Sequence, residues 1–268
     1  VAKIFLDRVC QSNQIEKIQK THGSVMGFPY KAVVFDWAFT LVDLGNEDDV
    51  QPFSRLYENL KEKGFSSLPD SEEMYKACRE VFYEMINLSR HTHREACFER
   101  VLEFILLRYK LNISGIVTLN ELLEVYYKEM YKERVVYPDV VPVLEKLKSF
   151  GVRLGIVSNT TNPSFMKDYE RKLMQLDSYF EISIYSSEVP FRKPHPSIFE
   201  IAISRLKLAP KDILFVGDDL KSDIRGAQGV GIPALWINRT GKRNDGIAVP
   251  EYEAAIMTDI LQIQSVNV

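Results

Sequence analysis

Short runs of apolar residues alternate with longer amphipathic stretches along most of the chain. Residues 32–35 form a continuous apolar run rich in β-branched side chains, which is typical of a strand buried on both faces. Similar runs follow at 152–157, 213–216 and 234–237, with a weaker one at 182–185. Because helical patterns separate these strands, the chain is expected to fold as an α/β protein with a parallel sheet covered by helices on both faces.

Two of the helices are predicted between the later strands. Asp139 is placed to cap one helix, and Gly151 is placed to end it. The other begins after Pro194, and its apolar face carries Ile198, Ile201, Ala202 and Leu206.

Residues 48–133 have helical patterns and no convincing strand. Asp70 is placed to cap a helix, and Thr118 with Glu121 has the spacing of a capping box. Between them, apolar positions over 98–109 follow one helix face. The segment therefore predicts a small helical domain, called the cap below, that is inserted after the first strand.

The chain is thus predicted to have three parts. Residues 29–47 and 134–268 form a discontinuous core, and residues 48–133 form the cap. Residues 1–28 are weakly patterned and predict an N-terminal extension. Because Met26 stands just before the first strong element, residues 1–25 are expected to be dispensable.

Composition narrows the class of protein. The 268 residues include 34 Lys and Arg against 37 Asp and Glu, and the resulting net charge of −3 argues against a nucleic-acid partner. No apolar run reaches the roughly 18 residues of a membrane helix, which argues against a membrane partner. The three cysteines are scattered, and the chain becomes charged too early for a signal peptide. We therefore expect a cytoplasmic protein.

Polar residues follow the predicted strands where a parallel sheet binds its ligands. Four stretches stand at or beyond strand ends, namely residues 36–41, 158–160, 192–194 and 217–223. A phosphate is held well by a hydroxyl such as that of Ser158 and by an ammonium such as that of Lys193. Each stretch alone is ordinary turn or capping chemistry, but the four together favour a phosphate site.

The acidic residues in these stretches point to a metal. Asp36 facing Asp218, Asp219 and Asp223 would be strongly repelled unless a cation lay between them. A hard divalent ion that prefers oxygen ligands, most simply Mg²⁺, answers this need. An aspartate placed against a metal-bound phosphate can act as a nucleophile and form an acyl phosphate.

At these residues the chain resembles the haloacid dehalogenase-like hydrolase superfamily, over roughly residues 30–240. The family's four motifs are matched in order by Asp36 with Thr40, by Ser158, by Lys193, and by Gly217-Asp218 with Asp223. The resemblance implies a Rossmann-like core with a helical cap, dependence on Mg²⁺, and Asp36 as the nucleophile.

The first motif departs from the family at Ala38, where a second aspartate is usual. In the family's phosphatases that aspartate protonates the leaving group and then activates water, which contributes about 10²–10⁴-fold to the rate. Its backbone carbonyl also binds the metal, and Ala38 retains a carbonyl. We therefore expect magnesium binding to be kept and proton transfer to be weakened. Phe39, where Gly is common, is expected to narrow the entrance or pack under the cap.

The resemblance leads to one prediction of function, a phosphatase of a small phosphorylated metabolite. Asp36 and Lys193 are its predicted catalytic residues, Asp36, Asp218 and the Ala38 carbonyl would ligate Mg²⁺, and Asp223 would orient the metal's water or Lys193. The phosphoryl oxygens would be held by Thr40, Ser158, Asn159 and Lys193. Without the usual acid, the enzyme would prefer substrates whose leaving group needs no proton, such as acyl or aryl phosphates. The alternative is that another group replaces the missing acid, with Asp43, His91 and His93 as candidates.

Three alternatives stay open. The sequence Asp36-Trp37-Ala38 is similar to that of phosphonoacetaldehyde hydrolases, which use a cap lysine, and Lys76 is the nearest candidate by position. A 2-haloacid dehalogenase also lacks the second aspartate but uses no metal. A weakly active protein that binds phosphate is the third alternative.

Overall fold

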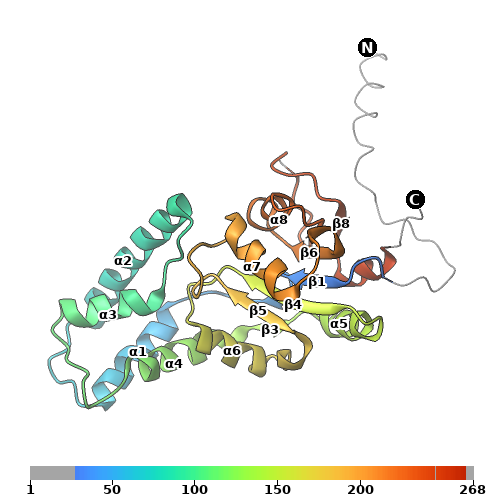
Figure 1. Ribbon diagram of the computed structural model, residues 1–268. Helices are drawn as coiled ribbons and strands as arrows, with labels where there is room; N and C mark the ends of the chain where they lie inside the picture. Colours follow the sequence, from blue (N-terminus) through green and yellow to red (C-terminus); the bar gives the residue numbers. More distant parts are fainter. Residues whose placement is uncertain (1–27, 245, 264–268) are drawn as a thin grey trace, which may run out of the picture.

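A six-stranded parallel sheet forms the centre of the computed structural model, which describes residues 28–244 and 246–263 (Figure 1). The strand order is β5-β4-β1-β6-β7-β8, and each neighbouring pair is parallel. The strands are β1 (Ala32–Phe35), β4 (Arg153–Ser158), β5 (Ile182–Tyr185), β6 (Ile213–Gly217), β7 (Ala234–Ile237) and β8 (Tyr252–Ala254). The five predicted strands and the α/β fold class are confirmed; the short edge strand β8 was not predicted.

Helices cover both faces of the sheet, as the continuous apolar strands require. Val33 and Phe35 pack in the cluster that contains the apolar side of α5 (Val140–Ser149), whereas Ala32 and Val34 pack in the cluster of α7 (Pro196–Leu206). These four strand side chains are fully buried. The core also contains α6 (Ser164–Leu173) and α8 (Arg225–Gln228). β1 therefore lies at the centre of the core, between β4 and β6.

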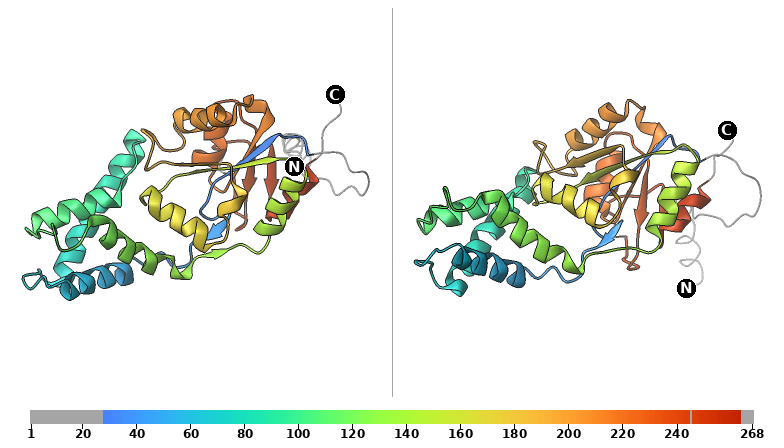
Figure 2. Two further views of the ribbon diagram at one scale, coloured as in Figure 1. Left: turned by 60° about the horizontal axis from the view of Figure 1, so that its bottom comes forward. Right: turned by 90° about the horizontal axis from the view of Figure 1, so that it is seen from below.

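The cap helices lie together at one end of the molecule (Figures 1 and 2). They are α1 (Val50–Glu62), α2 (Ser71–Thr92), α3 (Phe98–Arg108) and α4 (Leu119–Met130), and a 3₁₀ turn, η1 (Tyr131–Glu133), follows them. Asp70 caps α2 by accepting from two backbone N–H groups, and Thr118 with Glu121 forms the predicted capping box. The cap has its own apolar cluster, which Met166 of α6 joins from the core.

The two connections between core and cap pair with each other. β2 (Val42–Asp43) and β3 (Val135–Val136) form an antiparallel ladder, in which Val42 faces Val136. Two-residue strands are too short to leave a periodic pattern, so the sequence did not predict them. The ladder fixes both ends of the cap beside the loop that follows β1.

The helix-capping role predicted for Asp139 is wrong. Asp139 precedes α5 but its side chain makes no capping hydrogen bond. Its carboxylate instead accepts two bonds of 3.0 Å from Arg239 and one of 2.6 Å from the Met257 N–H. A bidentate arginine is a stronger partner for a carboxylate than a helix N–H group. Asp139 therefore ties α5 to the C-terminal part of the core.

Two further predictions concern the N-terminal segment and a membrane-spanning helix. The predicted N-terminal extension, and the hypothesis that residues 1–25 are dispensable, lie outside the described residues except for Phe28. Among the described helices, none combines the length and the hydropathy that are needed to cross a membrane.

Candidate active site

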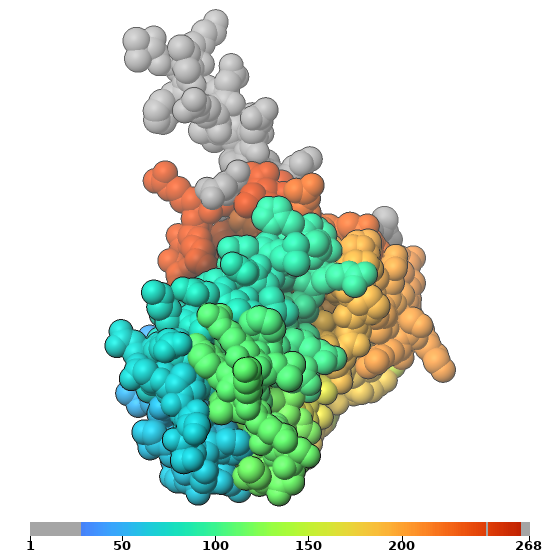
Figure 3. Space-filling view, turned by 90° about the vertical axis from the view of Figure 1, so that its left-hand side faces the viewer, coloured from blue at the N-terminus to red at the C-terminus, as the bar shows by residue number. Residues whose placement is uncertain are grey.

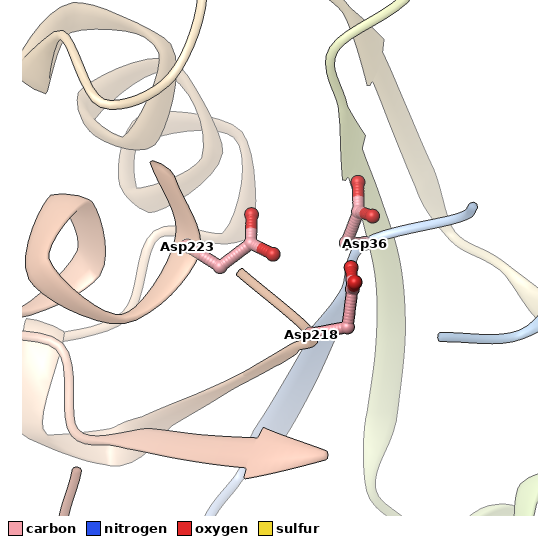
Figure 4. A group of neighbouring side chains, drawn as sticks. All are labelled: Asp36, Asp218 and Asp223. Carbon is pink, nitrogen blue, oxygen red and sulfur yellow. The ribbon is translucent and has the colours of Figure 1, made fainter. Parts of the chain in front are cut away.

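Asp36 lies at the centre of the sheet edge where the strands end. It follows β1 directly, its N–H donates to the Val216 carbonyl at 2.9 Å, and its side chain is largely buried. Asp36, Asp218 and Asp223 point toward one another, and a carboxylate oxygen of each lies within 4.8 Å of the others (Figure 4). The structure thus brings together three acidic residues of the first and fourth motifs, which are far apart in the sequence.

Lys193 lies between two of these carboxylates. Its Nζ is 2.7 Å from Asp36 Oδ1 and 2.7 Å from Asp223 Oδ1, and the side chain is buried. Burial lowers the pKa of Lys193, but the charges of Asp223 and Asp36 outweigh it and raise that pKa above its usual value. Lys193 is therefore held as an ammonium group beside Asp36.

Asn159 holds the backbone of Lys193. Its Nδ2 donates to the Lys193 carbonyl at 3.0 Å, and its Oδ1 accepts from the Lys193 N–H at 2.8 Å. The side-chain amide predicted to bind phosphate is thus already engaged by the loop that carries the lysine. Asn159 positions Lys193 from the end of β4.

Asn159→Ala is expected to lower kcat and to destabilise the fold by about 1–3 kcal/mol, because it leaves two backbone groups without their partner. Phosphate release and urea denaturation measure the two effects. Asn244→Ala is the matched control, since Asn244 also makes two hydrogen bonds to the backbone, to Gly246 and Ala248. A kcat for Asn159→Ala as high as that of the control would show that Lys193 needs no such support.

The acidic cluster fits a divalent cation. Burial raises the pKa of Asp218 to about 8, with the charges of Asp36 and Asp223 adding to the effect. Burial also raises the pKa of Asp223, to about 6, although Lys193 opposes the shift. One ammonium group therefore does not balance the three carboxylates, and an all-oxygen donor set of this kind suits Mg²⁺.

The fourth motif is shaped so that Asp223 can approach the end of β6. A Cβ atom at Gly217 would lie 2.4 Å from Asp223 Oδ2, so only glycine is tolerated there. Asp219 instead caps the next turn, η4 (Leu220–Ile224), by accepting from the N–H groups of Lys221 and Ser222. Asp218 and Asp223, rather than Asp219, therefore face Asp36.

The loop after β1 is tightly folded. Two bonds to the Trp37 carbonyl, from the N–H groups of Leu41 and Val42, close it at 2.9 and 3.1 Å. Phe39 adopts a left-handed conformation with φ of 57°, lies 43% exposed and lines the cavity described next, as expected of a residue at the entrance. Thr40 is fully buried, and its hydroxyl has no partner among the described residues. Ala38 is partly exposed.

A cavity of about 290 Å³ opens between this loop and the cap. Ala38, Ser158 and Asn159 line it from the core, and its charged lining residues are Glu47, Arg90, Glu95, Arg134, Lys167 and Arg192. A second cavity of about 540 Å³ adjoins it on the cap side and is lined by Phe82, Tyr83, Phe98, Tyr126 and Tyr127 among others. Among the described residues, neither cavity is lined by Asp43, His91 or His93. The same holds for the more deeply placed Asp36, Lys193, Asp218 and Asp223.

The cap is also fastened to the core beside Lys193. Arg192 donates to Ser89 at 2.9 Å and to Glu95 at 3.2 Å, and the Ser186 hydroxyl donates to Glu95. Figure 3 shows the teal cap helices meeting the yellow and orange part of the core along one edge. Arg192 and Glu95 also line the cavity of about 290 Å³.

A buried ionic cluster that the sequence pattern does not predict lies behind the loop after β1. Glu170 of α6 is fully buried and accepts from Trp37 Nε1 at 2.9 Å, from Lys167 Nζ at 2.5 Å and from Arg134. Arg134 directly follows η1, where the cap ends. Charged residues on a helix are usually exposed, and only the spacing of three residues between Lys167 and Glu170 hints at the pair. The cluster joins the loop after β1 to the end of the cap.

Glu170→Gln is expected to destabilise the fold by about 3–5 kcal/mol, because Lys167 and Arg134 would keep their charges in a buried place without a carboxylate. Urea denaturation measures the loss. Glu181→Gln is the control, since Glu181 pairs with Arg153 at the surface and such pairs contribute about 0–1 kcal/mol. Equal losses for the two variants would contradict a special role for the buried cluster.

Comparisons with known proteins agree with this geometry. A family model described as haloacid dehalogenase-like hydrolase matches residues 30–231. The glyceraldehyde 3-phosphate phosphatase of Methanopyrus kandleri is 31% identical over 251 residues, which cover 87% of this chain and 96% of that protein.

Two solved structures are similar as well. A HAD phosphatase from Thermococcus onnurineus is 30% identical, with a TM-score of 0.58 over 86% of this chain and 95% of that one. A 2-haloacid dehalogenase from Pseudomonas syringae pv. Tomato DC3000 is 26% identical, with a TM-score of 0.67 over 87% and 98%. The core, the inserted helical cap and the matched motifs have one explanation: the chain belongs to the haloacid dehalogenase-like hydrolase family.

Proposed function

We propose that this protein is a magnesium-dependent phosphatase that forms an aspartyl phosphate on Asp36. The observation that carries the proposal is the Asp36 carboxylate, held by Lys193 beside Asp218 and Asp223 at the end of the central strand. The name of the similar Methanopyrus kandleri protein, a glyceraldehyde 3-phosphate phosphatase, supports a small phosphorylated metabolite as the substrate. Location in the cytoplasm, and the lack of a nucleic-acid or membrane partner, stay predictions from composition.

The phosphoryl group would lie between Asp36 and the end of β4. Ser158 lines the cavity there, and among the described residues its hydroxyl makes a single long contact, 3.4 Å to the carbonyl of Asn159. The Thr40 hydroxyl, which has no partner within residues 28–244 and 246–263, supports a second polar contact from the loop after β1. Lys193 would screen the negative charge that develops on the phosphoryl oxygens. Asn159 would act through Lys193.

The reaction then has two displacement steps. An oxygen of Asp36 forms a bond to phosphorus while the bond from phosphorus to the leaving oxygen breaks, and that oxygen needs a proton. Water then gives up a proton and forms a bond to the same phosphorus while the bond to Asp36 breaks, which restores the carboxylate. Asp36, Asp218 and the Ala38 carbonyl would hold Mg²⁺, which would add positive charge next to the phosphoryl oxygens. Asp223 orients Lys193, as their ion pair indicates.

The chemistry of the site favours this reaction over the alternatives. The candidate for a phosphonoacetaldehyde hydrolase, Lys76, is exposed on α2, and among the described residues no cap lysine lines either cavity. The surplus of negative charge around Asp218 supports a metal, which a 2-haloacid dehalogenase does not use.

Removal of the metal tests the proposal. Phosphate release from 4-nitrophenyl phosphate and from glyceraldehyde 3-phosphate is expected to fall by about 10²-fold or more in EDTA, because a Lewis acid contributes several kcal/mol, and to return with added Mg²⁺. Chloride release from 2-chloropropionate is measured in parallel. Phosphate release that is insensitive to EDTA, or chloride release as the only activity, would overturn the proposal.

A further inference from the structure

Lys167 is a buried ammonium group beside the loop that lacks the usual acid. Its Nζ lies 2.5 Å from Glu170 Oε2 and 4.9 Å from the centre of the Trp37 ring, and the side chain is almost fully buried. The residue also lines the cavity that Ala38 and Ser158 line. An ammonium group has three N–H donors, and among the described residues Glu170 is its only hydrogen-bond acceptor. Lys167 can therefore donate to a molecule in the cavity.

The cavity contains few groups that can give a proton to a leaving oxygen. Arginine keeps its proton in proteins, which excludes the three arginines of the lining. Glu95 accepts from Arg192 through one oxygen and from Ser186 through the other, so both of its oxygens are already engaged by the core. The Glu47 side chain is 51% exposed. Lys167 is the buried lining group that carries a proton, and its Nζ lies over the ring of Trp37, the residue between Asp36 and Ala38.

The surroundings of Lys167 lower its pKa below the usual value for a lysine. Burial lowers the pKa of Lys167; the charge of Glu170 opposes the shift and that of Arg134 adds to it. Asp36, on the loop after β1, also raises the pKa, and the Tyr185 ring of β5 lies 5.9 Å from Nζ. An acid works best when its pKa lies near the operating pH, so a lysine with a lowered pKa is a better donor than an exposed one.

We propose that Lys167 protonates the leaving oxygen of the substrate, in place of the acid that is absent at Ala38. The inference rests on the phosphatase function proposed above. In the first step a proton moves from Lys167 Nζ to the leaving oxygen as its bond to phosphorus breaks and the bond to Asp36 forms. In the second step the neutral amine takes a proton from the attacking water, whose oxygen bonds to phosphorus as the bond to Asp36 breaks. The lysine is thereby regenerated as an ammonium group.

The test compares a substrate that needs the proton with one that does not. Glycerol 3-phosphate has a poor alcohol leaving group, whereas 4-nitrophenol leaves as the anion. In Lys167→Met the ratio of kcat/KM for glycerol 3-phosphate to that for 4-nitrophenyl phosphate is expected to fall by about 10²–10⁴-fold. Lys172→Met, on the exposed side of the same helix, should keep the ratio of the unaltered protein. Equal losses on both substrates would mean a structural role for Lys167 and would overturn the proposal.

Two further variants separate proton transfer from charge and from folding. Lys167→Arg keeps a cation beside Glu170 but cannot release its proton. The ratio of kcat/KM for glycerol 3-phosphate to that for 4-nitrophenyl phosphate should therefore fall as far as in the methionine variant. It also replaces that variant if Lys167→Met does not fold. An arginine variant with full activity on glycerol 3-phosphate would show that charge alone suffices and would overturn the proposal. The proposal would also be overturned if the ratio of kcat/KM values fell in Glu95→Gln and not in Lys167→Arg. If the unaltered protein releases no phosphate from either substrate, the proposed function itself fails.

Discussion

Asp36→Asn is expected to lower phosphate release by about 10⁴-fold or more, the scale of loss when a nucleophile is removed. The amide has nearly the same size as the carboxylate, but its oxygen is a poor nucleophile and cannot form the aspartyl phosphate. The fold should survive, because the amide oxygen can still accept from Lys193 and because one of three clustered negative charges is removed. The measurement is the rate with 4-nitrophenyl phosphate and Mg²⁺.

The control for this variant is Asp43→Asn. Asp43 is an exposed aspartate of β2 and lies seven positions later in the chain, outside the acidic cluster. Its variant should keep the rate of the unaltered protein, and thermal melting of both variants shows that they are folded. Rates for Asp36→Asn and Asp43→Asn that are the same would favour the alternative of a protein that only binds phosphate.

Ala38→Asp is expected to raise turnover of alkyl phosphates by about 10²–10⁴-fold when it is introduced together with Lys167→Met. Ala38 lines the cavity, so a carboxyl group at this position would lie in it. That group is expected to supply the proton that Lys167 supplies in the unaltered protein. In the protein with Lys167 intact the gain should be smaller, because a proton donor is already present. Rates with glycerol 3-phosphate and 4-nitrophenyl phosphate show whether the gain is confined to the alkyl ester.

Ala38→Asn in the same Lys167→Met background is the matched control, since it has the size of aspartate and no acidic proton. It should leave alkyl phosphate turnover low. If asparagine restored the rate as well as aspartate, a polar contact rather than a proton would explain the effect. If neither did, the account of Ala38 as the site of a missing acid would be wrong.

The sequence predicted the parts of the site that lie on short loops after buried strands. The runs ending at Phe35, Val157 and Val216 are apolar on both faces, so their order and direction place Asp36, Ser158 and Asp218 at one edge. The capping box at Thr118 was equally local and was confirmed. Features that are determined by a few neighbouring residues could therefore be predicted from the sequence alone.

The features that depend on contacts between distant segments could not be predicted. Asp139 has the position of a helix cap, yet its carboxylate accepts two hydrogen bonds from Arg239, which lies one hundred residues later in the chain. Lys167 and Glu170 look like an exposed ion pair on a helix until Arg134 and Trp37 are placed against them. A single sequence does not show which charged residues the packing of core against cap will bury.

The proposed reaction requires that Asp36 becomes covalently phosphorylated during turnover. Mixing the protein with substrate and Mg²⁺, quenching in acid within a single turnover, and mapping the phosphorylated peptide by mass spectrometry would detect this intermediate. One phosphoryl group is expected on the peptide that contains Asp36, lost on treatment with hydroxylamine and absent in Asp36→Asn. Phosphate released with no acyl phosphate formed, or with the label on another residue, would contradict it.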